Sequence, residues 1–280
     1  MPNDNNFNSS SKDFSVDLRT YNSPVEMSQE HYHHYYEILY LTHNSRILKI
    51  GDNRYNLNKY SVALLPPFIP HMTLSDGDVP QRRICVYFRS EFIREIELAL
   101  NTNLLACFNP EYPVRAVDDF FDSFYHNMCE IEKNCTSSEP SEKLMLRNRL
   151  LLCDTLLLLN NKTILSNNEN VFQKIITYIE KNFNKRITLE LLSKEFFIDP
   201  FTISRKFNSI IGMPLPKYIS TIRIIHAKKM LLESKASLTD IAMACGFSSL
   251  SDFDRVFKTD TGMTPFKYRK NTTEKNYLKN

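Results

Sequence analysis

The sequence predicts a multi-domain α+β fold, in which a small N-terminal β-barrel with following helices precedes an all-α C-terminal domain. Two observations predict this fold. Short alternating apolar runs separated by turn residues occupy residues 37–88, and apolar residues recur at helical spacing from residue 91 onward. A chain of 280 residues with 42% hydrophobic and 24% charged residues can form such domains with proper cores.

Glycine and cysteine usage excludes several classes of function. The five glycines are too far apart to build a phosphate loop or a dinucleotide-binding turn. The six cysteines include no Cys-x-x-Cys pair and follow no leader sequence, so we expect reduced thiols. The most apolar stretch, Leu150–Leu159, is shorter than the roughly 18 to 20 residues of a membrane span. We therefore expect a cytoplasmic protein without a membrane segment.

The N-terminal half is predicted to hold closely spaced strands that form a small sandwich or barrel. The predicted strands are Glu37–Leu41, Arg46–Ile50, Tyr55–Leu57, Ser61–Leu65 and Ile84–Phe88. After residue 90 the apolar period becomes helical, through residues 91–100, 118–133 and 142–160.

Charge divides the chain into two parts. Residues 1–168 hold 16 Lys and Arg against 21 Asp and Glu, a net of −5, whereas residues 169–280 hold 19 against 11, a net of +8. A basic C-terminal third suits a polyanion, and nucleic acid is the first candidate. An ordinary solvated basic face is the alternative.

The basic third also contains an internal repeat at an offset of fifty residues. The residues that recur in identical form are Arg205, Phe207, Gly212, Met213, Lys217 and Tyr218, matched by Arg255, Phe257, Gly262, Met263, Lys267 and Tyr268. Further up the chain Phe197 recurs as Phe247, and Leu191 is matched by Ile241. The basic C-terminal third of the chain is therefore built from two similar units.

Each unit is predicted to be two helices joined by a tight turn. In the first unit Thr188 caps a helix that runs through Phe196. Asp199 then caps a second helix, with Pro200 at its first position. Gly212 ends this second helix, because glycine adopts the left-handed conformation that closes a helix.

The second unit follows the same plan. Thr239 and Asp240 start its first helix, and Gly246 makes the turn. Ser249 caps its second helix, which ends at Gly262.

Two short helices with such a turn form a helix-turn-helix, whose second helix fits the major groove of DNA. A helical hairpin used only for packing is the alternative. The apolar residues at helical spacing are expected to point inward, namely Ile203, Phe207, Ile210, Phe253, Val256 and Phe257. The candidate DNA-binding residues on the remaining face are Phe201, Thr202, Ser204, Arg205, Asn208, Leu250, Ser251, Asp252, Arg255 and Lys258. Arginine can bind guanine bidentately and lysine can neutralise phosphates, unless a nearby acid such as Asp252 or Asp254 pairs with the arginine.

Residues 217–234, between the units, carry an apolar stripe and are predicted to form one continuous helix. Roughly 17 helical residues span about 25 Å. With flanking turns, the two second helices could then lie about one DNA turn, near 34 Å, apart.

These residues resemble the DNA-binding domain of AraC/XylS-type transcriptional regulators. The resemblance covers residues 171–270 and is closest in SLTDIAMACGFSSLSDFDRVFKTDTGMTPFKYRK, from Ser237 to Lys270. It implies two helix-turn-helix units joined by a long helix that bind promoter DNA, usually in activators that contact RNA polymerase. By position it implies DNA contacts at Phe201, Ser204, Arg205, Leu250, Ser251, Asp252 and Arg255.

Two features depart from the family pattern. Asp252 and Asp254 place acid on the second recognition helix, so we expect the first unit to carry more of the affinity unless one acid accepts from a cytosine amino group. Pro214 and Pro216 leave the start of the linking helix open.

The N-terminal half has a second resemblance. His31-x-His33 followed by Glu37, with His71 after a proline-rich stretch, resembles the motifs of a cupin barrel, which is also the usual sensor domain of the same regulator family. In metal-binding cupins such a set holds divalent iron, manganese or zinc. The flanking glycines of that motif are missing here, so we expect a metal-free pocket with no cofactor and keep a metal at His31, His33, Glu37 and His71 as the alternative.

A pocket in such a barrel would present aromatic faces and a few fixed polar groups to a small ligand. The candidate effector-binding residues are His33, Tyr35, Glu37, Tyr40, Arg46 and His71. Core filling is the alternative role for the tyrosines. A sugar or another small metabolite is what the resemblance implies.

Leu144, Leu151 and Leu158 recur at seven-residue spacing, with Leu150 and Leu157 alongside. Such a stripe forms either a homodimer seam or a helix packed on its own barrel, and the family resemblance favours a homodimer.

The expected organisation is a disordered arm (1–18), a cupin-like effector-sensing barrel (19–100), a helical dimerisation or packing segment (101–160), a linker (161–170), the double helix-turn-helix domain (171–270) and a disordered tail (271–280). The leading hypothesis is a non-enzymatic regulator, expected to be an activator, that binds promoter DNA and senses a small metabolite. The alternatives are a metal-dependent cupin enzyme fused to a DNA-binding module and a regulator that needs no ligand.

Overall fold

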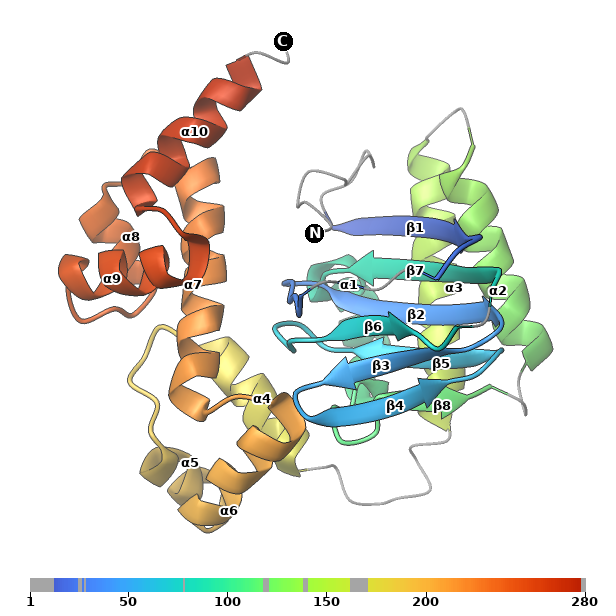
Figure 1. Cartoon of the computed structure of the whole chain (residues 1–280), viewed down its shortest axis with the longest axis horizontal. Coiled ribbons are helices and arrows are strands. Elements are labelled where there is room, and N and C mark those ends of the chain that lie inside the picture. The colour runs from blue at the N-terminus through green and yellow to red at the C-terminus, as the bar shows by residue number, and fades with distance from the viewer. Residues whose placement is uncertain are drawn as a thin grey trace. The chain divides into compact units, whose positions relative to one another are not determined.

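A computed structural model describes residues 13–24, 27, 29–77, 79–117, 121–137, 141–161 and 171–277 (Figure 1). They form two units, a β-rich unit within residues 13–161 and a helical unit within residues 171–277, and each is described by itself. No helix among the described residues is long and apolar enough to cross a membrane.

The β-rich unit contains two antiparallel sheets followed by two long helices. Its strands are β1 (Phe14–Tyr21), β2 (Tyr36–His43), β3 (Arg46–Ile50), β4 (Asn53–Leu57), β5 (Ser61–Leu65), β6 (Met72–Ser75), β7 (Gln81–Phe88) and β8 (Val114–Ala116). One sheet has the order β1-β7-β2-β5-β8 and the other β4-β3-β6. Its helices are η1 (Ser90–Phe92), α1 (Arg94–Leu100), η2 (Leu104–Cys107), α2 (Phe121–Cys135) and α3 (Glu142–Asn161).

All five predicted strands are present, as β2, β3, β4, β5 and β7, and the sequence prediction missed β1, β6 and β8. The disordered arm predicted at residues 1–18 is wrong from Phe14 onward, because Phe14 to Leu18 pair with β7. Residues 1–12 and most of the predicted linker, residues 162–170, lie outside the described residues.

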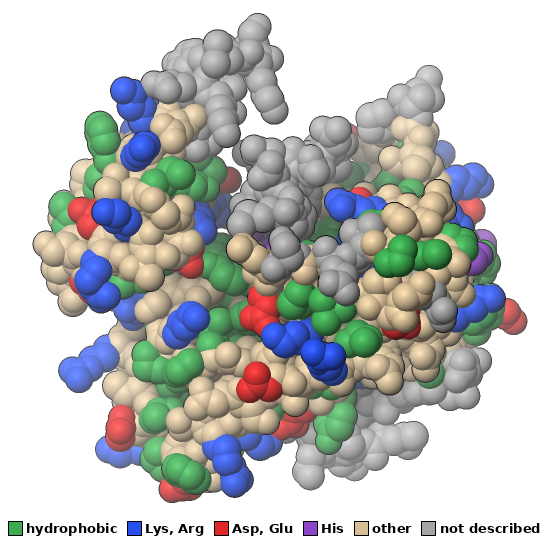
Figure 2. All heavy atoms as spheres, in the orientation of Figure 1, with side chains coloured by type: hydrophobic (Ala, Val, Ile, Leu, Met, Phe, Trp, Pro, Cys, Tyr) green, Lys and Arg blue, Asp and Glu red, His purple; other side chains and the backbone are tan. Residues whose placement is uncertain are grey.

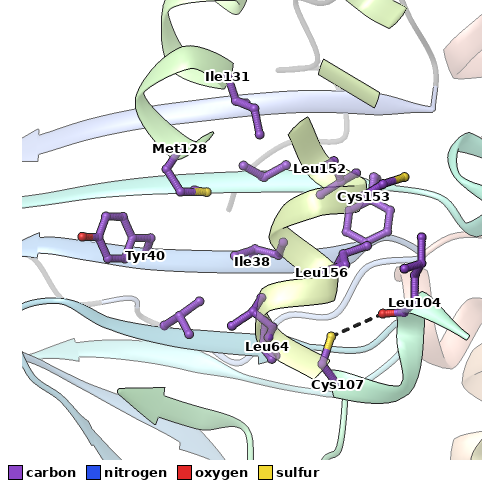
Figure 3. Packing of buried hydrophobic residues seen from close by; sticks show 14 of the residues in the cluster. Ile38, Tyr40, Leu64, Leu104, Cys107, Met128, Ile131, Leu152, Cys153 and Leu156 are labelled. Atoms are coloured by element: carbon purple, nitrogen blue, oxygen red, sulfur yellow. Dashed lines mark hydrogen bonds between the residues drawn. The ribbon is translucent and has the colours of Figure 1, made fainter. Parts of the chain in front are cut away.

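Strand alternation sorts the side chains of the larger sheet onto two faces. On one face Ile38, Tyr40, Ile84 and Val86 join a buried apolar cluster with residues of α2 and α3. Figure 3 shows Ile38 and Tyr40 in one layer with Met128 and Leu156. The opposite face carries buried apolar residues such as Leu39 and Ala63 and also the buried polar residues Glu37, Gln81 and Arg83.

The helical unit contains α4 (Val171–Asn182), α5 (Leu189–Phe196), α6 (Pro200–Lys206), a π-helical turn η4 (Phe207–Ile211), α7 (Leu215–Glu233), α8 (Leu238–Ala244), α9 (Leu250–Thr261) and α10 (Pro265–Tyr277). Predicted caps are confirmed at Thr188, Asp199 and Ser249, whose side chains accept from backbone N–H groups three residues on. The start predicted at Thr239 is wrong. Ser237 is the cap, since its hydroxyl accepts from the Asp240 N–H and lies beside the Asp240 carboxylate.

The turns of the two units differ by one residue. Phe197 takes the left-handed conformation (φ 56°) two residues before its cap, whereas Gly246 (φ 81°) lies three residues before Ser249. By backbone conformation Phe197 is therefore the counterpart of Gly246. The fifty-residue offset had matched it with Phe247, and that match is wrong. Phe197 is 94% exposed, while Phe247 is buried.

The connecting helix α7 begins at Leu215 with Pro216 in its first turn, so both prolines stand where helix geometry tolerates them. Its 19 residues correspond to about 28 Å. The predicted disordered tail is wrong for residues 271–277, which continue α10.

Candidate functional site

The second helix of each helix-turn-helix unit buries one face and exposes the other. Ile203, Phe207, Phe253 and Phe257 are buried as predicted, and Ile210 and Val256 are half-buried. The candidate DNA-binding residues lie on the outer faces. Phe201, Arg205, Asn208, Leu250, Ser251, Arg255 and Lys258 are exposed, and Thr202, Ser204 and Asp252 are half-exposed.

The two outer faces differ in charge. On α9 the Arg255 guanidinium Nη2 donates to Asp252 Oδ1 at 2.8 Å, so the alternative in which a nearby acid pairs with the arginine is present. On α6, Arg205 has no ion pair within the part of the chain that the structure describes. Figure 2 shows Lys and Arg side chains scattered over the visible face of this helical unit. Among the described residues, α6 thus presents an arginine without an ion pair and α9 a paired one.

In the β-rich unit, three of the predicted effector residues meet between the sheets. His33 Nε2 lies 2.9 Å and His71 Nε2 3.3 Å from the same Glu37 carboxylate oxygen, Oε2. Glu37 and His71 are buried, and His33 is nearly so. Burial alone would raise the pKa of Glu37, but the hydrogen bonds from both histidines hold that pKa well below its ordinary value.

The backbone fixes the orientation of these rings. His33 Nδ1 lies 3.0 Å from the Tyr35 carbonyl oxygen and His71 Nδ1 2.8 Å from that of Ile69. Because a carbonyl only accepts, both Nδ1 atoms carry the hydrogen.

His31 completes this group. Its backbone pairs with that of His71, and the two ring centroids lie 4.3 Å apart. Burial, with the neighbouring His71, lowers the pKa of His31 to about 3, so its ring is neutral. Its Nδ1 is buried without a hydrogen-bond partner.

This donor set fits a divalent transition metal. Ring nitrogens of His31, His33 and His71 all lie within 4.8 Å of one another, and Glu37 lies beside them. Bonds from Nδ1 to carbonyl oxygens are also what orients metal-binding histidines in proteins. The cluster therefore has the donor atoms that one divalent cation needs.

Tyr40 is not part of this site. It lies three residues from Glu37 on β2, so alternation turns it to the other face, where its ring packs on Phe124. Tyr35 is buried beside the site, but its ring lies against His34 and the Arg89 guanidinium.

Arg46 lies in a second polar group between the sheets. Its guanidinium donates to the side chain of Gln81 and to Oγ1 and the carbonyl oxygen of Thr73. Its carbon Cζ lies 5.2 Å from the centre of the Tyr21 ring. The structure thus places His33, Glu37 and His71 in a histidine cluster and Arg46 in an arginine cluster, and leaves Tyr35 and Tyr40 outside both.

Sequence reasoning missed Tyr21, Gln81 and Arg83, which share the arginine cluster. A signal was present in β7, where apolar Ile84, Val86 and Phe88 alternate with polar or reactive side chains. The predicted strand began only at Ile84 and left the first three residues of β7 out.

The two units match two family models. Residues 14–151 match the AraC-like ligand binding domain, and residues 192–271 match a helix-turn-helix domain. The chain belongs to the AraC/XylS family of transcriptional regulators. As an AraC-family protein it carries an N-terminal ligand-binding domain and a C-terminal helix-turn-helix DNA-binding domain.

Relatives of this AraC-family chain are themselves regulators. The transcriptional activator RhaS of Escherichia coli (strain SE11) is 22% identical over 241 residues, 84% of this chain and 85% of RhaS. AdaA of Bacillus subtilis (strain 168), a bifunctional transcriptional activator and DNA repair enzyme, is 37% identical over 95 residues. This match spans 34% of the chain and 45% of AdaA, so the chain covers less than half of that relative. A regulator of Staphylococcus aureus (strain MSSA476), SAS0078, is 36% identical over 110 residues, 39% of this chain and 14% of the relative.

The architecture is also that of a solved AraC-family structure. An apo form of a ToxT variant from Vibrio cholerae strain SCE256 aligns with a TM-score of 0.50 at 14% identity, over 92% of this chain and 97% of ToxT. This similarity supports the predicted order of a β-sheet domain followed by a helical domain.

Proposed function

We propose that this chain is a cytoplasmic transcriptional activator that binds promoter DNA through α6 and α9 and responds to a small metabolite bound in its β-rich unit. One observation carries the proposal. Each of these helices turns an apolar face inward and leaves arginine, serine and asparagine or lysine side chains to solvent, and such side chains contact bases and phosphates.

Selection of random-sequence duplexes by the purified chain tests the DNA-binding part. The proposal predicts enrichment of two short elements about one helical turn apart, one for each unit. Binding without an enriched motif, and with a salt dependence equal for all duplexes, would contradict it.

We further propose that the chain is a homodimer and that the activator contacts RNA polymerase. The structure changes which leucines are candidates for the seam. Leu151 and Leu158 pack on the core of their own unit, whereas Leu150 and Leu157 of α3 are exposed, as is Leu146. Light scattering of Leu150→Asp against the native chain tests the seam, and an unchanged dimer mass would exclude this face.

A second candidate function rests on the histidine cluster. In a metal-dependent cupin enzyme fused to a DNA-binding module, His31, His33, Glu37 and His71 would hold the ion, which would supply Lewis-acid chemistry. Stoichiometric metal in the purified chain, lost in His31→Ala, would favour this hypothesis. The absence of metal from both proteins, with DNA affinity that a metabolite changes, would favour the regulator. DNA affinity that no metabolite changes would indicate a ligand-independent regulator.

A further inference from the structure

Two buried arginines share one acceptor between the sheets. Arg46 Nη2 lies 3.2 Å and Arg83 Nη1 3.5 Å from Thr73 Oγ1. Arg46 is 1% exposed and Arg83 8% exposed. Their Cζ atoms lie 5.2 and 5.5 Å from the centre of the Tyr21 ring, so one aromatic ring contacts both cations.

Arg83 forms no direct ion pair within the described part of the chain, and the Glu37 carboxylate attracts it only over a longer distance. Its one hydrogen bond there is the long contact to Thr73, and its Nε is buried without a partner. The carboxylates that share the inner face of the sheet are already engaged. Glu37 binds two histidines, and Asp17 pairs with Arg19 at 2.7 Å.

A guanidinium stays charged at any pH that a protein tolerates. A buried charge without a partner destabilises the fold, so such an arrangement persists where the charge serves binding. Carboxylate and phosphate groups match the two parallel N–H groups of a guanidinium better than any neutral polar group does.

The arginine cluster lies beside an edge of the sandwich. β1 and β6 are edge strands of different sheets and are not hydrogen-bonded to each other. The inward residues of β1, Asp17, Arg19 and Tyr21, are half-exposed, whereas Arg83 on the neighbouring strand β7 is buried behind them. Met27 contacts the β6 side of this edge, where its backbone N–H donates to the Thr73 carbonyl oxygen, and on the β1 side the half-exposed Tyr21 ring lies 5.5 Å from Arg83 Cζ.

We propose that the effector carries an anionic group, a carboxylate or a phosphate, which binds to Arg83 and Arg46 beside the Tyr21 ring. This inference rests on the proposed function, because it names the chemical class of the molecule that the regulator senses. The histidine cluster is not part of this anion site.

Calorimetry of the full chain tests the proposal with the smallest probes, sodium acetate and sodium phosphate, against sodium chloride at equal ionic strength and pH. Arg83→Met removes the charge and keeps much of the side-chain volume. Arg82→Met is the matched control, because Arg82 precedes it on the same strand but points to the other face and pairs with Glu132.

Acetate or phosphate at about ten times its dissociation constant is expected to raise the Tm of the β-rich unit by about 2 to 4 °C over chloride. The rise should occur in the native chain and in Arg82→Met and be absent from Arg83→Met. The anion that gives the larger rise identifies the group as carboxylate or phosphate. Equal Tm values in all three salts, or an equal rise in Arg83→Met, would overturn the proposal.

A second readout uses chloride alone. Arg83→Met is expected to keep or raise the Tm, since it removes an unpaired buried charge. A Tm below that of Arg82→Met would show that Arg83 is structural and would also overturn the proposal. Measuring DNA binding with the same preparations distinguishes a failure of the anion site from a failure of the proposed regulatory function. If the chain binds selected DNA but neither anion, only the anion-site proposal is contradicted. If it binds an anion but no DNA, the proposed function is contradicted.

Discussion

Arg255 and Asp252 form an ion pair one helical turn apart on the exposed face of α9, with 2.8 Å between Nη2 and Oδ1. The pair holds the Arg255 side chain against its own helix. On α6 the corresponding Arg205 has no such partner among the described residues. The two helix-turn-helix units therefore both expose an arginine, and among the described residues only Arg255 is held in an ion pair.

Asp252→Asn should strengthen binding to selected DNA by about 0.3 to 1 kcal/mol, because it frees Arg255 and removes a charge that repels phosphate. Fluorescence anisotropy with a labelled duplex measures the change, and Glu190→Gln, an acid on α5, is a control for net charge alone. Weaker binding on one sequence only would instead show that Asp252 reads a cytosine.

Phe197→Gly should raise the unfolding free energy of the helical unit by about 0.5 to 1 kcal/mol, since Phe197 is exposed and held in the left-handed region. The matched change Gly246→Ala should destabilise it, because a Cβ there would meet the Asn184 backbone. Urea unfolding measures both. Destabilisation by Phe197→Gly would mean that the ring has a packing role.

Tyr40→Phe should leave the β-rich unit as stable as before or up to about 1 kcal/mol more stable. The Tyr40 hydroxyl is buried without a hydrogen-bond partner, and burial raises its pKa. Effector binding should be unchanged, since the ring faces α2. A loss of effector response in a stable Tyr40→Phe variant would restore the original prediction for this residue.

Glu180 on α4 should make the helical unit less stable as the pH rises. Burial raises the pKa of its carboxyl from 4.5 to about 8, so the folded unit keeps a proton that the unfolded chain loses. The contribution of protonated Glu180 to the unfolding free energy is therefore fully present below pH 4.5 and is lost as the pH rises to about 8. Thermal unfolding of Glu180→Gln should show a gain over the native chain that is larger at about pH 8 than at about pH 5, and a constant difference would contradict this.

Local patterns predicted most of the helical unit. The caps at Thr188, Asp199 and Ser249 depend on side chains three residues from the N–H groups that they satisfy, so the sequence records them directly. The start at Ser237 was missed although it satisfies the same rule. The turn length was also missed, because the fifty-residue offset aligned Phe197 with Phe247 and disregarded backbone conformation.

The sensor interior was predictable only in part. The resemblance to the cupin motifs grouped His33 with Glu37, but strand alternation, which excludes Tyr40, was not applied to the site. Arg46 contacts Thr73 on the neighbouring strand of its own sheet and Gln81 on the other sheet, and no local pattern records such pairing. Phe14, Val16 and Leu18 alternate as a strand does, yet their place near the N-terminus led to an arm being predicted.

The most direct test of the account compares Arg205→Ala and Lys258→Ala on a selected duplex and on random DNA over a range of salt. If Arg205 reads a base, Arg205→Ala costs about 1 to 3 kcal/mol on the selected duplex and little on random DNA. Lys258→Ala should weaken both equally and make the salt slope shallower by about one. Native affinity of Arg205→Ala for the selected duplex would contradict the assignment of α6 as a recognition helix.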